Sequence, residues 1–179
     1  MKSTAIFLDR DGVLNKPVVR AGKPFPPAQA EDVEIYDGLR EQLQRLKERG
    51  FVLIVVTNQP DVARGTTSRQ KIDEINHLIA HELPAIDRIL VCFHDSGDGC
   101  NCRKPRPGML LEAAREFNVD LRRSYMVGDR RGDMEAGSCV GSRTIFIDRG
   151  YEELQPAQYD HRVSSTTEAL NIIENECKK

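Results

Sequence analysis

The sequence has no tryptophan, few aromatic residues and no long apolar run. Aromatic residues make up 6% of the 179 residues, and no basic stretch is interleaved with them as in proteins that stack on single-stranded nucleic acid. Lysine and arginine number 26 against 28 aspartates and glutamates, so there is no basic field to attract nucleic acid or an anionic membrane. No apolar run approaches the roughly 20 residues that a membrane-spanning helix needs. We therefore expect no nucleic-acid or membrane partner.

The sequence also lacks internal repeats, low-complexity segments and an export signal. The first apolar run, at residues 5–8, is too short for the core of a signal peptide, and no small-residue cleavage site follows it. A chain of 179 residues with 39% hydrophobic residues has the right size for one domain with a substantial core. We predict a single domain over residues 1–179, monomeric and cytoplasmic.

Strand-like and helix-like hydrophobic patterns alternate along the chain. Short apolar runs rich in β-branched residues indicate strands, and apolar residues repeated every three or four positions indicate helices. Strands are predicted at residues 4–8, 51–57, 88–94, 124–129 and 143–148. Helices are predicted at residues 38–50, 68–83, 107–119, 133–141 and 165–179, and an ordered loop at residues 16–33. The alternation predicts an α/β fold in which a parallel sheet carries helices on both faces.

Polar residues follow the predicted strands at the places where the strands end. In a parallel sheet these carboxyl ends lie along one edge, where ligands of such folds bind. Asp9 and Asp11 follow the first strand, and Asp129 ends the fourth. Two carboxylates two positions apart repel each other unless a cation lies between them, and Mg²⁺ prefers oxygen ligands. We predict a Mg²⁺ site at Asp9, Asp11 and Asp129, with Gly12 permitting the sharp turn behind it.

The same edge carries groups suited to phosphoryl transfer. Asp9 can attack phosphorus and form an aspartyl-phosphate, while Asp11 protonates the leaving oxygen and later deprotonates the attacking water. Thr57 and Lys104 offer a hydroxyl and a positive charge to the phosphoryl oxygens. Asp133 is then expected to orient Lys104 or to bind a metal-held water.

Three of the five cysteines lie between residues 92 and 102. Because disulfides are unfavourable in the cytoplasm, metal binding has to be considered for this group. Cys92, His94, Cys100 and Cys102 make a complete set of tetrahedral zinc ligands, and a site without an open position is structural. Free thiols beside a surface histidine are the alternative. Cys139, in a helical stretch, is expected to be a small buried apolar group.

The motifs DRDGV, VVTN, RKP and VGDRRGD, in this order, resemble those of the haloacid dehalogenase-like superfamily of aspartate-nucleophile phosphatases. The resemblance covers nearly the whole chain and implies a three-layer, Rossmann-like fold. It implies that Asp9 is the nucleophile, that Asp11 binds the metal through its backbone carbonyl, and that Asp129 is the third ligand. Thr57 and Lys104 would hold the phosphoryl group. The second acid points to phosphatases, since the dehalogenase branch has no leaving alkoxide to protonate.

The cysteine loop resembles one branch of that superfamily, the small cap-less sugar and amino-alcohol phosphatases. Two kinds of enzyme in that branch carry such a loop, the heptose 1,7-bisphosphate 7-phosphatases and the histidinol-phosphate phosphatases. The short gap between His94 and Cys100 is more like the histidinol enzymes. The stretches VARG and CRKPRPGML are more like the heptose enzymes, and they supply Arg64 and Arg103 for a second phosphate. We expect a small phosphorylated sugar as substrate, with a heptose bisphosphate as first choice.

The substrate loops also carry departures from the heptose pattern. Pro60 and Asp61 replace a small, flexible pair and add a negative charge near the ligand. A histidinol-phosphate phosphatase, another sugar-phosphate phosphatase and a zinc-dependent binding module stay open as alternatives. Further substrate contacts are expected from Asn15, Asn58, Gln59 and Arg130.

Overall fold

The structure, a computed structural model, describes residues 2–176 and alternates strands with helices along that range. The strands are β1 (Ala5–Leu8), β2 (Val18–Arg20), β3 (Lys23–Phe25), β4 (Val52–Asn58), β5 (Arg88–Cys92), β6 (Tyr125–Gly128), β7 (Arg143–Ile147) and β8 (His161–Val163). The helices are α1 (Leu39–Glu48), α2 (Arg69–Glu82), α3 (Gly108–Glu116), α4 (Arg131–Cys139) and α5 (Thr166–Glu176). Residues 177–179 of the predicted last helix lie outside the described residues.

A six-stranded parallel sheet in the order β5-β4-β1-β6-β7-β8 forms the centre of the molecule. Strand β1 lies between β4 and β6, with Ala5 opposite Val52 and Ile6 opposite Tyr125. The predicted parallel α/β fold is confirmed. Strand β8 was not predicted, because three residues of mixed polarity carry no clear strand pattern.

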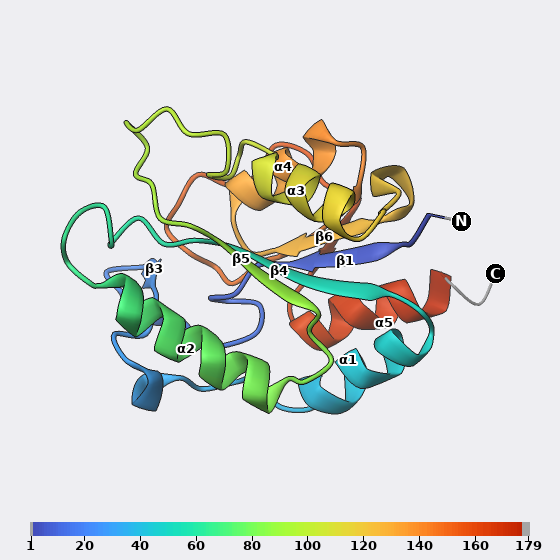
Figure 1. The fold of residues 1–179 in the computed structure, drawn as a ribbon, viewed down its shortest axis with the longest axis horizontal. Helices are drawn as coiled ribbons and strands as arrows, with labels where there is room; N and C mark the ends of the chain where they lie inside the picture. The colour runs from blue at the N-terminus through green and yellow to red at the C-terminus, as the bar shows by residue number, and fades with distance from the viewer. Residues whose placement is uncertain (1, 177–179) are drawn as a thin grey trace.

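Helices cover both faces of the sheet, as Figure 1 shows, with α1, α2 and α5 on one face and α3 and α4 on the other. The alternation of side chains along β1 explains the two layers. Ile6 and Leu8 pack with the first group of helices, and Phe7 packs with the second. All three are fully buried, which is why this strand reads as an unbroken apolar run.

Local signals set the helix ends close to their predicted positions. The Ser68 hydroxyl accepts a hydrogen bond from the Lys71 backbone N–H (3.3 Å) at the start of α2. Gly50, with φ +88°, follows the end of α1 in the left-handed conformation that glycine adopts freely. Within residues 2–176, no helix has both the length and the apolar character needed to cross a membrane.

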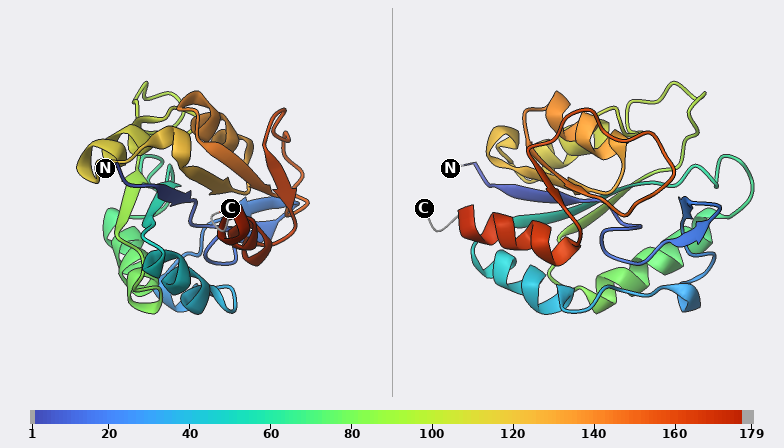
Figure 2. Two further views of the ribbon diagram at one scale, coloured as in Figure 1. Left: turned by 90° about the vertical axis from the view of Figure 1, so that its right-hand side faces the viewer. Right: turned by 180° about the vertical axis from the view of Figure 1, so that it is seen from behind.

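The segment predicted as an ordered loop holds the antiparallel hairpin β2–β3, with Val18 opposite Phe25. The view from behind in Figure 2 shows this hairpin at the end of the molecule away from the two termini. Cys139 is exposed, so the prediction of a buried apolar group was wrong. It ends α4 on the side facing solvent, which helix periodicity alone did not resolve.

Candidate active site

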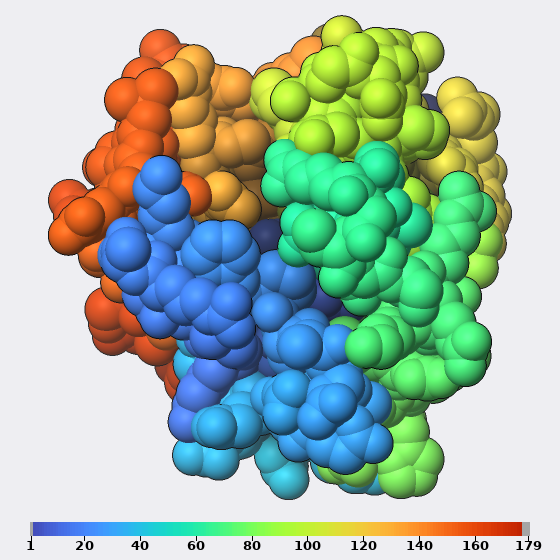
Figure 3. All heavy atoms as spheres, turned by 90° about the vertical axis from the view of Figure 1, so that its left-hand side faces the viewer, coloured from blue at the N-terminus to red at the C-terminus, as the bar shows by residue number. Residues whose placement is uncertain are grey.

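The carboxyl ends of β1, β4 and β6 meet at a cavity of about 350 Å³. Figure 3 looks into this hollow, whose floor is formed by residues near the N-terminus and whose walls come from several loops. The floor brings together predicted residues from four separate motifs: Asp9, Asp11, Thr57, Lys104 and Asp133. The walls are formed by Lys23, Pro24, Phe25, Pro26, Asn58, Pro60, Asp61, Arg64, Arg103, Arg130, Gly132 and Glu153.

Asp9 is a buried carboxylate held in place from both sides. Its backbone N–H donates to the Val127 carbonyl of β6 (3.0 Å), which continues the sheet pairing for one residue beyond β1. Its Oδ1 accepts a hydrogen bond from Lys104 Nζ (2.8 Å). Burial raises the pKa of Asp9 to about 6, although the positive charge of Lys104 acts in the opposite direction. The carboxylate is therefore poorly hydrated, and one partner fixes its orientation.

Lys104 links three elements through its ammonium group. Nζ lies 2.8 Å from Asp9 Oδ1, 2.6 Å from Asp133 Oδ1 and 2.6 Å from the Val56 carbonyl. Burial lowers the pKa of Lys104, but the charges of Asp133 and Asp9 outweigh it and hold the pKa above its usual range. The Asn58 side chain fixes the Lys104 backbone, since it donates to the carbonyl (3.0 Å) and accepts from the N–H (3.1 Å).

Asp129 completes a cluster of buried carboxylates. Its ligand atoms and those of Asp9 and Asp133 all lie within 4.8 Å of one another. Burial raises the pKa of Asp129 well above its usual value, and the charges of Asp9 and Asp133 add to the effect. Both Asp129 oxygens are buried and lack a hydrogen bond of standard geometry among the described residues. Three carboxylates around one ammonium leave an excess of negative charge, so the donor set fits a hard divalent cation such as Mg²⁺.

Gly12 is required by the shape of this cluster. It has φ +90°, and a Cβ atom added there would lie 1.7 Å from Asp129 Oδ2. Arg149 Nε donates to the Gly12 carbonyl (3.0 Å) and holds the turn from the end of β7. Tyr151, which was not predicted, places its buried hydroxyl beside Asp129, and burial raises the pKa of that hydroxyl above its usual range.

The Asp11 carboxylate is held by three side chains. Arg10 Nη2 lies 2.9 Å from Oδ2, and Gln59 Nε2 donates to the same oxygen (2.9 Å). Asn15 Nδ2 donates to Oδ1 (3.0 Å). Asn15 and Gln59 were predicted to contact substrate, but both are buried and neither lines the cavity. Gln59 also donates to the Thr57 hydroxyl (2.9 Å), so it joins the two catalytic candidates.

Arg10 is a buried charged residue next to the site that the sequence did not reveal. It is fully buried and contacts Asp11, and its Nη1 donates to Asn76 Oδ1 on α2 (2.9 Å). A buried guanidinium needs such partners, because an unpaired charge in the interior is strongly unfavourable. The only signal in the sequence was the position of Arg10 two residues after the predicted apolar strand. This signal does not distinguish a buried position from a solvated one.

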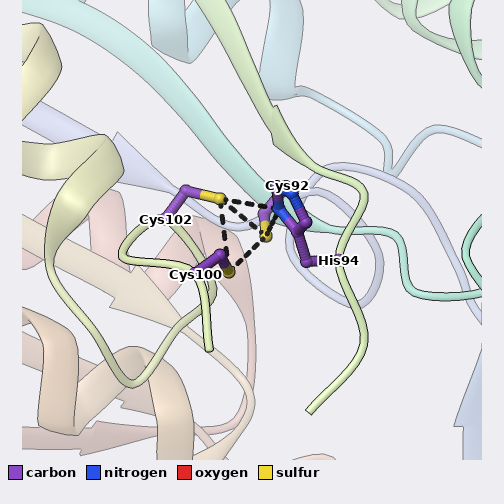
Figure 4. Close-up of side chains that lie close together, drawn as sticks. All are labelled: Cys92, His94, Cys100 and Cys102. Carbon is purple, nitrogen blue, oxygen red and sulfur yellow. Dashed lines mark hydrogen bonds between the residues drawn. The ribbon is translucent and has the colours of Figure 1, made fainter. Parts of the chain in front are cut away.

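The four predicted zinc ligands come together at the end of β5 and in the loop that follows it, as the close-up in Figure 4 shows. Sγ of Cys102 lies 2.9 Å from Sγ of Cys92 and 3.6 Å from that of Cys100. His94 Nδ1 lies 3.3 Å from Cys102 Sγ. Zinc–sulfur bonds of about 2.3 Å in a tetrahedron place sulfur ligands about 3.8 Å apart, so the cluster is slightly tighter than a loaded site. The donor set fits zinc and leaves no position for a substrate.

Three predicted substrate arginines line the cavity, each already paired with a neighbour. Arg64 binds Asp95 through Nε (2.8 Å) and Nη2 (2.7 Å). Arg130 binds Glu153 in the same two-pronged way, at 2.9 and 2.6 Å. Arg103 Nη1 donates to the His94 carbonyl (3.1 Å). The carboxylate partners lie far from their arginines in the sequence or in different motifs, which is why the pairing was not predicted.

Comparisons with known proteins agree with this geometry. Residues 25–141 match the family model of haloacid dehalogenase-like hydrolases. A D-glycero-beta-D-manno-heptose-1,7-bisphosphate 7-phosphatase from Pasteurella multocida is 41% identical over 157 residues, which cover 82% of each chain. A D-glycero-alpha-D-manno-heptose-1,7-bisphosphate 7-phosphatase from Campylobacter jejuni is 33% identical over 177 residues, 97% of each chain.

The solved structures include a close relative in shape. The crystal structure of a D,D-heptose 1,7-bisphosphate phosphatase from B. bronchiseptica, complexed with magnesium and phosphate, superposes with a TM-score of 0.82 at 26% identity. The match covers 97% of this chain and 99% of the other.

Proposed function

The chain belongs to the haloacid dehalogenase-like hydrolases, and we propose that it is a Mg²⁺-dependent phosphatase acting on the 7-phosphate of D-glycero-D-manno-heptose 1,7-bisphosphate. The observation that carries the proposal is the buried cluster in which Lys104 joins Asp9 and Asp133 beside Asp129. Asp9, Lys104 and Asp133 of this cluster line the floor of a cavity large enough for a sugar phosphate. The heptose assignment draws on the relatives that match most of the chain.

In the proposed reaction, an oxygen of Asp9 attacks phosphorus, and the bond from phosphorus to the sugar oxygen breaks. Asp11 donates a proton to that oxygen, so that the sugar leaves as an alcohol. Asp11 then accepts a proton from the water that attacks the aspartyl-phosphate, which releases inorganic phosphate and restores Asp9. Lys104 and Thr57 stabilise the negative charge on the phosphoryl oxygens.

The metal complement of this proposal follows from the two donor sets. Mg²⁺, held by Asp9, Asp129 and the backbone carbonyl of Asp11, would offset the negative charge that builds up on phosphate and carboxylates. Zinc at the four Cys and His ligands would order the loop that leads to Arg103 and Lys104. Reduced thiolate ligands fit a reducing compartment, so we place the enzyme in the cytoplasm. We expect it to act as a monomer.

A histidinol-phosphate phosphatase is the second candidate, and one observation favours it. Asp61 adds a carboxylate to the cavity wall, where it could pair with a substrate ammonium group. A heptose bisphosphate has no such cation. The two candidate substrates therefore differ at this wall, because histidinol phosphate would bring an ammonium group to Asp61 and a heptose bisphosphate would not.

The test is a phosphate-release assay with Mg²⁺ on heptose 1,7-bisphosphate, heptose 7-phosphate, hexose phosphates and histidinol phosphate. We expect the heptose bisphosphate to give the highest kcat/KM and Asp9→Asn to lose at least about a thousandfold in kcat, because no nucleophile is left. Glu116→Gln, which alters only an exposed ion pair with Arg88, serves as the control. Full activity in Asp9→Asn would refute the mechanism, and a preference for histidinol phosphate would replace the substrate.

A further inference from the structure

The Cys/His loop (residues 92–102) contacts the substrate loop (residues 59–67) through an ion pair, in addition to the backbone hydrogen bond from Gln59 N–H to the Cys92 carbonyl (2.7 Å). Asp95, directly after His94, accepts two hydrogen bonds from Arg64, one from Nε at 2.8 Å and one from Nη2 at 2.7 Å. Figure 3 shows the two loops side by side above the hollow. The 59–67 loop is also closed on itself, since the Arg64 N–H donates to the Pro60 carbonyl (3.1 Å). Asp95 therefore ties the two loops together at this wall.

This ion pair contributes little to stability. The side chains of Arg64 and Asp95 are 47% and 30% exposed, and exposed ion pairs are weak because solvent screens them. Asp95 is nevertheless firmly held. Its backbone N–H donates to Asp98 Oδ2 (2.8 Å), and its Oδ1 accepts from the Ser96 N–H (2.7 Å). A well-ordered partner for an exposed arginine indicates positioning.

Arg103 is held by His94, the residue that precedes Asp95 in the Cys/His loop. Its Nη1 donates to the His94 carbonyl (3.1 Å), and both Arg103 and Arg64 line the cavity. A guanidinium carries five N–H donors, of which Arg64 uses two on Asp95 and one, at 3.4 Å, on Asp61. The remaining donors on the two η nitrogens stay in one plane and can bind a ligand. Consecutive residues of the Cys/His loop thus fix two guanidinium groups at one wall.

We propose that Asp95 is a positioning residue for substrate specificity, which holds Arg64 beside Arg103 so that the pair receives a second anionic group of the substrate. The inference rests on the proposed sugar-phosphate activity and deepens it. The phosphoryl group that reacts lies on the floor, at Asp9, and a second phosphate would lie at this wall. The Cys/His loop then contributes to recognition as well as to stability, although none of its metal ligands touches the substrate.

Geometry and charge make opposite predictions for removal of Asp95. If charge alone mattered, loss of a carboxylate would make the wall more positive and would improve binding of a bisphosphate. If positioning matters, Arg64 loses its fixed plane and must be ordered again on binding, which weakens affinity. The sign of the effect therefore distinguishes the two explanations.

The experiment compares heptose 1,7-bisphosphate with heptose 7-phosphate, which share the reacting group and differ only in the second phosphate. For Asp95→Asn we expect KM for the bisphosphate to rise about tenfold with little change in kcat, the equivalent of one charge-assisted hydrogen bond. We expect KM for the monophosphate to change by less than about twofold, since its far end carries no phosphate.

A double-mutant cycle tests whether Asp95 acts through Arg64. In an Arg64→Met background, Asp95→Asn should cause no further rise in KM, because the group that it positions is gone. Glu116→Gln controls for loss of an exposed ion pair elsewhere, and bound zinc is measured in each variant to detect disruption of the loop. If Asp95→Asn does not fold or loses zinc, Arg64→Lys, which keeps the charge without the fork, should show the same selective loss.

An unchanged or lower KM for the bisphosphate in Asp95→Asn overturns the inference while the proposed function stands. An equal loss on both substrates also overturns it, since the effect would not concern the second phosphate. If the wild-type protein releases phosphate from p-nitrophenyl phosphate but from neither heptose, the proposed substrate fails first. The inference would then fall with it.

Discussion

At the scale of single residues, the acidic cluster depends on how closely the backbone at Gly12 approaches the Asp129 carboxylate. Gly12 lets the turn after β1 lie against Asp129, and its φ of +90° is a conformation that other residues rarely adopt. The Asp11 carboxylate is held by Arg10, Gln59 and Asn15. Two acids only two positions apart thus have different surroundings: Lys104 contacts Asp9, and Arg10 contacts Asp11.

Gly12→Ala should disable the metal site without unfolding the protein. The added Cβ would lie 1.7 Å from Asp129 Oδ2, so the carboxylate or the turn must shift. We expect Mg²⁺ affinity, measured by calorimetric titration, to fall at least about tenfold, with a stability loss of about 1 kcal/mol from the positive φ. Gly50→Ala is the matched control, because Gly50 has φ +88° and nothing within 4 Å of its added Cβ. Unaltered Mg²⁺ binding in Gly12→Ala would contradict the assignment of Asp129.

At the scale of elements, the hairpin β2–β3 replaces a cap domain as the cover of the cavity. Lys23, Pro24, Phe25 and Pro26 line the cavity. Phe25 is 41% exposed, with Arg20 placed 5.9 Å from the centre of its ring. An aromatic ring that is only half buried in the protein offers its other face to a ligand, such as the C–H face of a sugar ring.

Phe25→Ala should therefore weaken substrate binding without a large effect on folding. We expect KM for the sugar phosphate to rise roughly three- to tenfold and kcat to stay within about twofold, since the ring does not touch the reacting atoms. Val19→Ala on the same hairpin is the control, because Val19 is 55% exposed and does not line the cavity. Steady-state kinetics and thermal unfolding check both variants. Equal effects of the two substitutions would refute a specific role for Phe25.

At the scale of the whole molecule, the parallel sheet gathers acids that are far apart in sequence. Asp9 follows β1 and Asp129 follows β6, and because these strands are neighbours, the two carboxylates share one edge. Burial raises the pKa of both groups. Without a bound cation, the ionised forms of these two carboxylates destabilise the folded protein. The cluster therefore lowers the stability of the protein while it supplies ligands for a metal ion.

The raised pKa of Asp9 predicts how the stability of the folded protein changes with pH. The pKa of Asp9 is about 6 in the folded protein, against 3.8 for an aspartate exposed to water, as in the unfolded chain. The penalty is thus absent below pH 3.8, grows as pH rises, and is complete above about pH 6. We expect Asp9→Asn, without Mg²⁺, to be more stable than wild type at pH 7.5 by about 1–3 kcal/mol. The gain should vanish as pH falls from about 6 to 4.

Denaturant unfolding across that pH range, with and without Mg²⁺, measures this effect. Mg²⁺ should stabilise the wild-type protein at pH 7.5 and stabilise Asp9→Asn much less, because one ligand is missing. A variant that is less stable than wild type at every pH would contradict the proposed strain at this cluster. The loss of one partner for Lys104 acts against the gain, which is why the expected value has a wide range.

The sequence by itself determined the parallel α/β fold and the ends of its main strands, because unbroken apolar runs and helical periodicity are local signals of burial. It also placed Asp9, Thr57 and Asp129 at one edge, since the topology of parallel strands fixes where their carboxyl ends meet. Only the tertiary structure decided that Asn15 and Gln59 bind Asp11, that Arg10 is buried, that Arg64 pairs with Asp95 and that Cys139 faces solvent. The physical reason is that hydrogen-bond partners are chosen by distance and direction across packed loops, and neither is encoded in the spacing of residues along the chain.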